Sequence, residues 1–384
     1  MPPTKRKLAE YMESYSPPGF FLQTVNRIVH YDFVQPFVYF VFWLVFTCIV
    51  SPLLGLIFLP LHLAYSVLMA VSNAFTGIPN DQELGVVITG CDTGFGNLLA
   101  IALAERYGDN LTIFATVVTN KGFDDLSAKV RKIEGGHSIV VVPLDVTDNE
   151  SVKNCAEIVN DWVKEDPSVR SLHAVVNNAG VGTGGEVDWL QMKNFEFDMG
   201  VNYFGMVRVT KAFLPLLKEQ EEERRGKKAS IEPRIINVTS MAGLTCGPTL
   251  ASYSASKHAA EAFSSTLRYE LSNWGIQVIT VNPSFHKTPL VGGIANGVDK
   301  VVKSMPKKQQ RQYGENYFDK TIKQAIQASS TAEWDADNVT TALIKAVVQA
   351  HPRSQMLIGL DAKFGIPLIR HSPVWIQDFT FKFG

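Results

Sequence analysis

The chain has 384 residues, of which 46% are hydrophobic and 19% charged, and its formal net charge is -1. The charged share is below the ~25% typical of soluble proteins, which predicts a segment buried in something other than protein. A nucleic-acid partner would call for a basic face, so the near-zero charge argues against one. The four cysteines, at positions 48, 91, 155 and 246, show no zinc-type spacing and predict neither a metal site nor a disulfide framework.

Residues 1–32 form a polar segment with a basic cluster at its start, and residues 33–80 contain no Asp, Glu, Lys or Arg. About 20 apolar residues are enough to cross a bilayer, so residues 33–80 predict a membrane anchor. Pro52 and Pro60 would kink or divide it. The sequence leaves open whether the anchor is one span or a hairpin, and therefore which side of the membrane the remaining chain faces.

Residues 81–362 predict one α/β domain. Short apolar runs rich in β-branched residues, typical of strands buried on both faces, alternate with amphipathic stretches typical of helices. Strands are expected at 84–90, 111–118, 138–146, 172–180, 234–240, 276–283 and 355–360, and helices at 95–107, 122–134, 149–164, 188–218, 250–274 and 332–350. This alternation predicts a doubly wound parallel sheet that binds its ligand at the carboxyl ends of the strands.

Two stretches near the end of the chain have less definite predictions. Residues 291–330 show few landmarks and are expected to include a lid over the substrate. Residues 363–384 form an amphipathic tail, in which 364–379 carry Phe, Ile, Leu and Trp around two prolines. This tail is equally compatible with dipping into a membrane surface and with packing on the domain.

A glycine-rich turn follows the first predicted strand. Gly90, Gly94 and Gly96 allow a sharp turn and a close backbone approach to a pyrophosphate at the start of the next helix. Thr93 and Phe95 belong to the same turn. After the fourth strand, asparagines 177 and 178 are expected to connect neighbouring strands, while Ala179 and Gly180 let the cofactor approach.

A second group of residues has the chemistry of an acid–base site. Tyr253 and Lys257 are four residues apart on a predicted helix and therefore share one face. An adjacent ammonium is expected to lower the phenol pKa and allow proton exchange with a substrate oxygen. Ser240, at the end of a strand, is placed to polarise that oxygen. Asn202 has two interpretations, a residue that fixes a water in a proton relay or a satisfied amide inside a helix.

With these motifs in order, residues 83–362 resemble a short-chain dehydrogenase/reductase, and the wording TGCDTGFG at 89–96 resembles the retinol, hydroxysteroid and β-hydroxybutyrate dehydrogenase branch. The resemblance implies a Rossmann-type catalytic domain in which Tyr253 is the acid/base. It also implies that Lys257 contacts the nicotinamide ribose, that Ser240 positions the carbonyl, and that Asn202 supports the relay. Asp145 would meet the adenine ring, and Thr288 the nicotinamide carboxamide.

One residue departs from the family pattern, because Pro283 is followed by Ser284 where the family usually has glycine. This puts the local cofactor-side geometry in question. The second strand and its loop offer neither an acidic reader of a ribose hydroxyl nor an arginine for a 2′-phosphate, and Lys121 is the one basic residue there. NAD is therefore expected as the cofactor, with NADP as the alternative.

The expected function is hydride transfer between NAD and an alcohol or carbonyl on a lipophilic substrate, a retinoid or a steroid. The alternatives are a carbonyl reductase or 3-hydroxy-acid dehydrogenase of the same branch, and a membrane-surface scaffold that has lost the reaction. The expected location is the endoplasmic reticulum membrane, with a mitochondrial membrane as the alternative. The resemblance also implies that a homodimer is possible.

Overall fold

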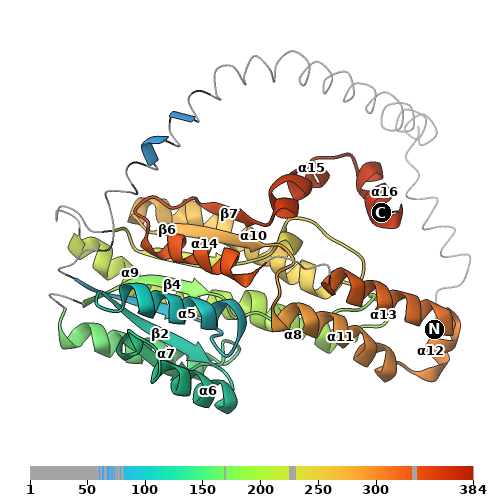
Figure 1. Cartoon of the computed structure of the whole chain (residues 1–384), viewed down its shortest axis with the longest axis horizontal. Helices are drawn as coiled ribbons and strands as arrows, with labels where there is room; N and C mark the ends of the chain where they lie inside the picture. The colour runs from blue at the N-terminus through green and yellow to red at the C-terminus, as the bar shows by residue number, and fades with distance from the viewer. Residues whose placement is uncertain are drawn as a thin grey trace, which may run out of the picture. The chain divides into compact units, whose positions relative to one another are not determined.

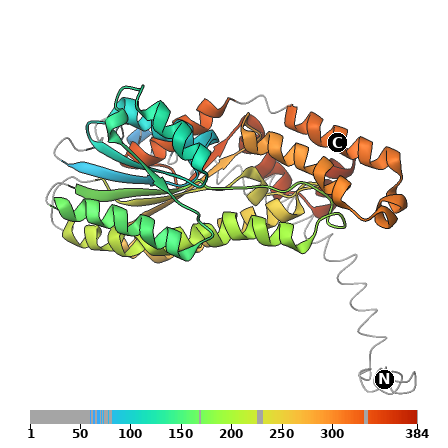
Figure 2. The same cartoon turned by 90° about the horizontal axis from the view of Figure 1, so that it is seen from below.

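A computed structural model describes residues 82–167, 170–224, 231–330 and 335–383, together with scattered residues between 60 and 78. The chain divides into two compact units, residues 1–72 and Asn73–Gly384, and the second contains the whole sheet (Figures 1 and 2). Most of the anchor predicted at residues 33–80 lies outside the described residues. Within the described ones, no helix is both long and apolar enough to cross a membrane.

A seven-stranded sheet with the order β3-β2-β1-β4-β5-β6-β7 forms the centre of the domain, and all its pairings are parallel. The strands are β1 Glu83–Ile88, β2 Leu111–Val117, β3 Ile139–Pro143, β4 Arg170–Asn177, β5 Arg234–Val238, β6 Gln277–Pro283 and β7 Gln355–Ile358. Each lies at a predicted position but most end earlier than expected. The predicted doubly wound parallel sheet is confirmed, and Ser240, expected as the last residue of a strand, follows β5.

Helices cover both faces of the sheet (Figure 2). Helices α5 Gly94–Tyr107, α6 Asn120–Val130 and α14 Ala336–Val348 share one apolar core with alternate residues of the strands, such as Val86 and Ile88. Helices α7 Asn149–Glu165, α9 Met206–Arg224 and α10 Ala251–Leu271 share the other core, which includes Val87. This alternation is the two-residue period of a strand buried on both faces.

The helix predicted at 188–218 starts later, at Met192, and contains a π-helical turn that was not predicted. The structure has α8 Met192–Met199, a π-helical turn η4 Gly200–Gly205, and then α9. A Cβ on Gly205 would lie 2.7 Å from Val146 Cγ2, so only glycine allows this close approach to the loop after β3. Single π-helical turns are frequent at functional sites, and this one contains Asn202.

Residues 289–330, where few landmarks were expected, form three helices. These are α11 Pro289–Ser304, α12 Lys307–Tyr313 and α13 Glu315–Ser330. Both views show them side by side beyond the carboxyl ends of the strands (Figures 1 and 2). Trp189, Val298, Met305 and Phe318 form their own small core. The group is therefore a packed layer over the strand ends, at the place predicted for the lid. That this lid covers a substrate stays a prediction.

The chain after β7 forms the π-helical turn η7 Asp361–Gly365 and two helices, α15 Ile366–Arg370 and α16 Val374–Phe383. Short 3-10 turns complete the domain: η3 Gly136–Ser138, η5 Met241–Gly243 and η6 Ser272–Trp274. Of the C-terminal segment, Ala362 and Ile366 are buried, whereas Phe364, Leu368 and Trp375 are each at least 70% exposed.

Candidate active site

A cavity of about 1050 Å³ lies at the carboxyl ends of the strands, between the sheet and the segments after β4, β5, β6 and β7. Of the residues predicted for the site, those lining it are Gly90, Thr93, Gly94, Phe95, Asp145, Asn178, Ala179, Gly180, Ser240, Tyr253, Lys257 and Thr288. Gly96 and Asn202 do not line the cavity but contact residues that do: Gly96 lies against Gly90 and Asn178, and Asn202 hydrogen-bonds Val181. The structure therefore brings all the predicted residues to one place.

Tyr253, Ser240 and Lys257 lie together in this cavity. Ser240 follows β5 and caps η5, its hydroxyl accepting from the Ala242 N–H at 3.1 Å, and it also hydrogen-bonds the Tyr253 hydroxyl. One turn further along α10, Lys257 lies with its Nζ 5.8 Å from the centroid of the Tyr253 ring. Lys257 Nζ donates to the Val238 carbonyl at 3.1 Å, which fixes the ammonium at the end of β5.

The pKa values of the two titratable groups are governed by burial. Burial raises the pKa of Tyr253 above 10, against an opposing effect of its hydrogen bond with Ser240. Burial lowers the pKa of Lys257 to about 8, so the ammonium is charged at neutral pH. The expected lowering of the Tyr253 pKa is therefore not found, because desolvation of the phenolate outweighs the groups that favour it. At neutral pH Tyr253 is a phenol, the form that donates a proton.

Asn202 is the satisfied amide of the two interpretations. Its Nδ2 donates to the Val181 carbonyl and to Ser256 Oγ, and its Oδ1 accepts from the Val181 N–H, each at 2.8 Å. The side chain thereby ties the segment after β4 to α10. These bonds engage both the nitrogen and the oxygen of the amide with protein groups. A part of Asn202 in a proton relay stays a prediction.

The glycine-rich turn is shaped for a close ligand. Gly94 has a φ of +66° with open space where a Cβ would lie, and it opens α5, whose N-terminal N–H groups favour a phosphate. Asn178 Nδ2 donates to the Thr89 carbonyl at 2.8 Å and to the Gly90 carbonyl at 3.1 Å. This confirms that an asparagine ties β4 to the end of β1. A Cβ on Gly96 would lie 2.5 Å from that amide, so glycine is required there.

Two further residues predicted to contact the cofactor, Asp145 and Thr288, line the cavity. Asp145 Oδ1 accepts from the N–H and hydroxyl of Thr147 at 2.8 and 2.7 Å, which orients the carboxylate. Thr288 is the N-cap residue of α11, but its hydroxyl makes no capping bond. Both residues lie where a dinucleotide would extend across the strand ends.

Ser284, the departure from the family pattern, is accommodated by its neighbours. Its hydroxyl donates to Asp361 Oδ2 and its N–H donates to the Ile358 carbonyl at 2.9 Å, so it joins β6 to the end of β7. The residue opposite is Gly359, whose φ is +115° and whose Cβ would lie 2.8 Å from Ser284 Cβ. The serine therefore fits because a glycine directly follows β7, the neighbouring strand.

Asp92 is a site residue that the sequence analysis overlooked. Its carboxylate accepts from the N–H groups of Val118 and Thr119, both at 3.0 Å, and from Thr119 Oγ1 at 2.7 Å. It therefore holds the loop after β2, where the adenosine ribose of a dinucleotide would lie, and it lines the cavity. The sequence signal that could have identified it is its position, since Asp92 is the one carboxylate in the glycine-rich turn between Gly90 and Gly96.

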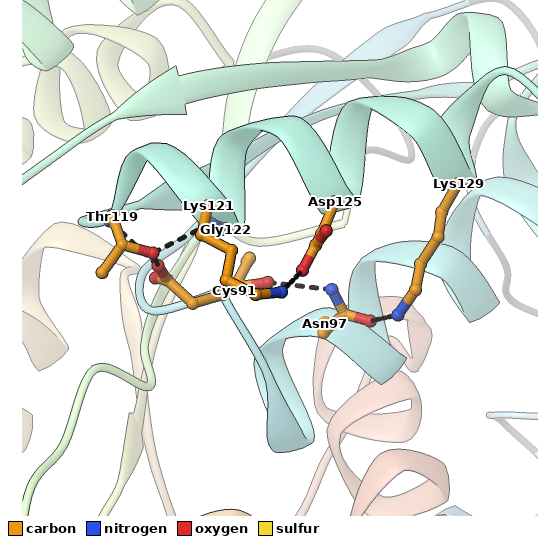
Figure 3. Close-up of polar contacts among 8 residues, drawn as sticks. Cys91, Asn97, Thr119, Lys121, Gly122, Asp125 and Lys129 are labelled. Carbon is orange, nitrogen blue, oxygen red and sulfur yellow. Dashed lines mark hydrogen bonds and ion pairs between the residues drawn. The ribbon is translucent and has the colours of Figure 1, made fainter.

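The two lysines of α6, the helix that follows this loop, both have polar partners (Figure 3). Lys121 pairs with Asp125 one turn along α6. Lys129 Nζ donates to Asn97 Oδ1 at 3.1 Å, while Asn97 Nδ2 donates to the Cys91 carbonyl at 2.9 Å. Neither ammonium is thus held toward the cavity.

Part of the remaining cavity wall is apolar. Its members come from α8, η4, the lid and the C-terminal segment: Phe197, Val201, Val291, Ile294, Ile366 and Ile369. Gly182 lets the lid pack closely, because its Cβ would lie 2.6 Å from Ile294 Cδ1 and 3.1 Å from Tyr253 Cδ2. Such a wall next to the Tyr253 hydroxyl favours a substrate with a large apolar body.

Comparison with known proteins agrees with this geometry. The family model described as short chain dehydrogenase matches residues 85–299. Short-chain dehydrogenase/reductase family 9C member 7 of Mus musculus is 33% identical over 79% of this chain and 91% of its own length. Retinol dehydrogenase 16 of Rattus norvegicus is 33% identical over 78% and 88%.

Among solved structures, a short chain dehydrogenase/reductase from Burkholderia phymatum in complex with NAD has a TM-score of 0.60 at 23% identity, over 78% of this chain and 96% of that one. One from Burkholderia cenocepacia J2315 in complex with NADP has a TM-score of 0.55 at 21% identity, over 79% and 99%. These two likenesses show the fold. The match over more than half of the sequence, together with its relatives, shows that the chain belongs to the short-chain dehydrogenase/reductase family and is related to the retinol dehydrogenases.

Proposed function

We propose that the chain is a membrane-anchored, NAD-dependent dehydrogenase that interconverts an alcohol and a carbonyl on a lipophilic substrate of the retinoid or steroid class. The observation that carries this proposal is the Tyr253 hydroxyl, hydrogen-bonded to Ser240 and next to Lys257, in a cavity with an apolar wall. The endoplasmic reticulum membrane is the expected location.

The side chains of the site supply the proton chemistry. A bound nicotinamide would accept or supply the hydride. The hydroxyls of Ser240 and Tyr253 hold the substrate oxygen between them and polarise it. In reduction Tyr253 donates its proton to the forming alkoxide, and in oxidation it takes the proton from the alcohol. The Lys257 ammonium stabilises the phenolate in either direction, while the apolar wall excludes water.

A preference for NAD over NADP is supported by charge. The Asp92 carboxylate lies at the loop where the ribose 2′ position of a dinucleotide would lie. A 2′-phosphate there would meet this carboxylate and no arginine. Lys121, the basic group of the loop, is already paired with Asp125.

The C-terminal segment supports access from a membrane. One side of it lines the cavity through Gly365, Ile366 and Ile369. On its other side, Phe364, Leu368 and Trp375 are 73%, 73% and 70% exposed. Large exposed apolar side chains on one short segment favour an interaction surface, and the 48 uncharged residues from 33 to 80 argue that the partner is a lipid bilayer. A lipophilic substrate would then enter the site directly from the membrane.

The proposal is tested with Tyr253→Phe, which removes the hydroxyl and keeps the ring. We expect turnover of all-trans-retinol or of a hydroxysteroid in lipid vesicles to fall at least ~10²-fold, with NAD affinity by calorimetry changed less than about twofold. The wild type is expected to bind NAD more tightly than NADP. Retained turnover in Tyr253→Phe would overturn the mechanism, and turnover confined to 3-hydroxybutyrate would overturn the substrate class.

A further inference from the structure

Asp198 on α8 is a fully buried carboxylate that the proposed reaction does not use. Its Oδ2 accepts from the Thr183 N–H at 3.1 Å and from Ser252 Oγ at 2.7 Å, and its Oδ1 accepts from Thr183 Oγ1 at 3.0 Å. The described ion pairs do not include it. Burying a carboxyl group that has only neutral hydrogen-bond partners is costly, so its presence calls for a reason.

The three donors lie on both sides of Tyr253. Ser252 is the residue before Tyr253, in the first turn of α10. Thr183 follows Gly182, whose Cβ would lie 3.1 Å from the Tyr253 ring. Asp198 therefore connects α8 with the segment after β4 and with the start of α10. These are two segments that contact Tyr253.

The charge of Asp198 also acts on the catalytic pair. Lys257 experiences two negative groups, Glu261 on its own helix and Asp198 from α8, and both favour the ammonium against its burial. Tyr253 is affected by burial, by the Ser240 hydroxyl and by Asp198. A nearby negative charge favours the protonated form of either group, so its removal would make both lose their protons at lower pH.

We propose that Asp198 is a positioning residue that anchors the first turn of α10 and keeps Lys257 charged beside Tyr253. The proposal rests on the proposed function, in which a charged Lys257 stabilises the phenolate. It assigns to the buried carboxylate an electrostatic task in addition to its hydrogen bonds.

The test is the titration of Lys257 in the intact chain, followed by NMR of ε-13C-labelled lysine and assigned with Lys257→Met. This readout needs neither substrate nor cofactor. In the wild type the Lys257 signal is expected to titrate near pH 8. In Asp198→Asn the midpoint is expected to fall by on the order of one pH unit. Glu196→Gln removes an exposed charge from the same helix and is expected to leave the midpoint unchanged.

A second variant addresses the possibility that Asp198→Asn does not fold. Asp198→Leu combined with Thr183→Val and Ser252→Ala removes the charge together with its two side-chain donors, so the Thr183 N–H is the one donor left without this partner. The same downward shift is expected in this triple variant, whereas Thr183→Val and Ser252→Ala alone keep the charge and the wild-type midpoint. An unchanged midpoint in a folded variant lacking the Asp198 charge would overturn the inference. Loss of the proposed function itself would appear separately, as retained turnover in Tyr253→Phe.

Discussion

Lys257 makes the stability of the protein depend on pH in a way that can be calculated from its burial. Its pKa is about 8 in the folded chain, whereas the ordinary value for a solvated lysine is 10.5. Between these values the unfolded chain binds more protons, so the free energy of unfolding rises with pH across this window. Below pH 8 the folded state bears the full cost of burying the charge, on the order of 3 kcal/mol.

Lys257→Met removes this dependence. At pH 7 the variant is expected to have a higher free energy of unfolding than the wild type. This difference is expected to shrink by about 3 kcal/mol between pH 7 and pH 10.5, and urea denaturation at each pH measures it. Lys300→Met, which changes an exposed lysine on α11, is the control, and its difference from the wild type is expected to stay constant. A constant difference for Lys257→Met would contradict the burial argument.

At the residue scale, the sequence predicts which side chains meet better than it predicts their electrostatics. Tyr253 and Lys257 were placed correctly, because four residues on a helix determine a shared face. The direction of the Tyr253 pKa was missed, since burial depends on the lid and on the segment after β4, which are far away in sequence. Asp198 was overlooked for the same reason: Thr183 and Ser252, its donors, lie 15 and 54 residues away.

At the element scale, the contact between the ends of β6 and β7 depends on Gly359. A side chain there would meet Ser284 Cβ at 2.8 Å and Asp361 Oδ1 at 2.5 Å, with φ at +115°. Gly359→Ala is therefore expected to lower the free energy of unfolding by about 1–3 kcal/mol. In a Ser284→Gly background the loss is expected to be smaller by about 1 kcal/mol, because one clash is removed.

Chemical denaturation of the four chains of this double-mutant cycle measures the coupling. Gly292→Ala on α11, where a Cβ meets nothing within 4 Å, is the control and is expected to be neutral or slightly stabilising. Purely additive losses at positions 284 and 359 would show that backbone strain alone accounts for the cost.

Strands could be predicted better than helices at this scale. Runs of β-branched residues identify strands that are buried on both faces. The π-helical turn Gly200–Gly205 was not predicted, since Gly205 packs against Val146, a residue of the loop after β3 that is distant in sequence. The lid helices α11–α13 were missed because their small core is completed by Trp189, over 100 residues earlier.

At the scale of the whole molecule, the alternation of strands and helices was sufficient to predict the topology, because parallel strands need crossover connections of one hand. The division of the chain is also visible in its composition. Residues 33–80 lack charge, whereas the residues after 81 carry the alternating pattern of a soluble core. The exposure of Phe364, Leu368 and Trp375 was not predictable, since it depends on how the C-terminal segment folds.

Membrane attachment is therefore expected to have two separable parts. A chain beginning at Asn73 contains the whole second unit and is expected to unfold cooperatively and to bind lipid vesicles weakly and reversibly. Replacing Phe364, Leu368 and Trp375 by serine in that chain should reduce vesicle binding at least tenfold, because each buried apolar side chain contributes about 1–3 kcal/mol. The same replacements at Val140, Ile158 and Tyr269, exposed elsewhere, are expected to leave binding unchanged in vesicle co-sedimentation. Equal losses in both triple variants would mean that the C-terminal surface has no special part in attachment, and the 33–80 segment would then be the sole anchor of the full chain.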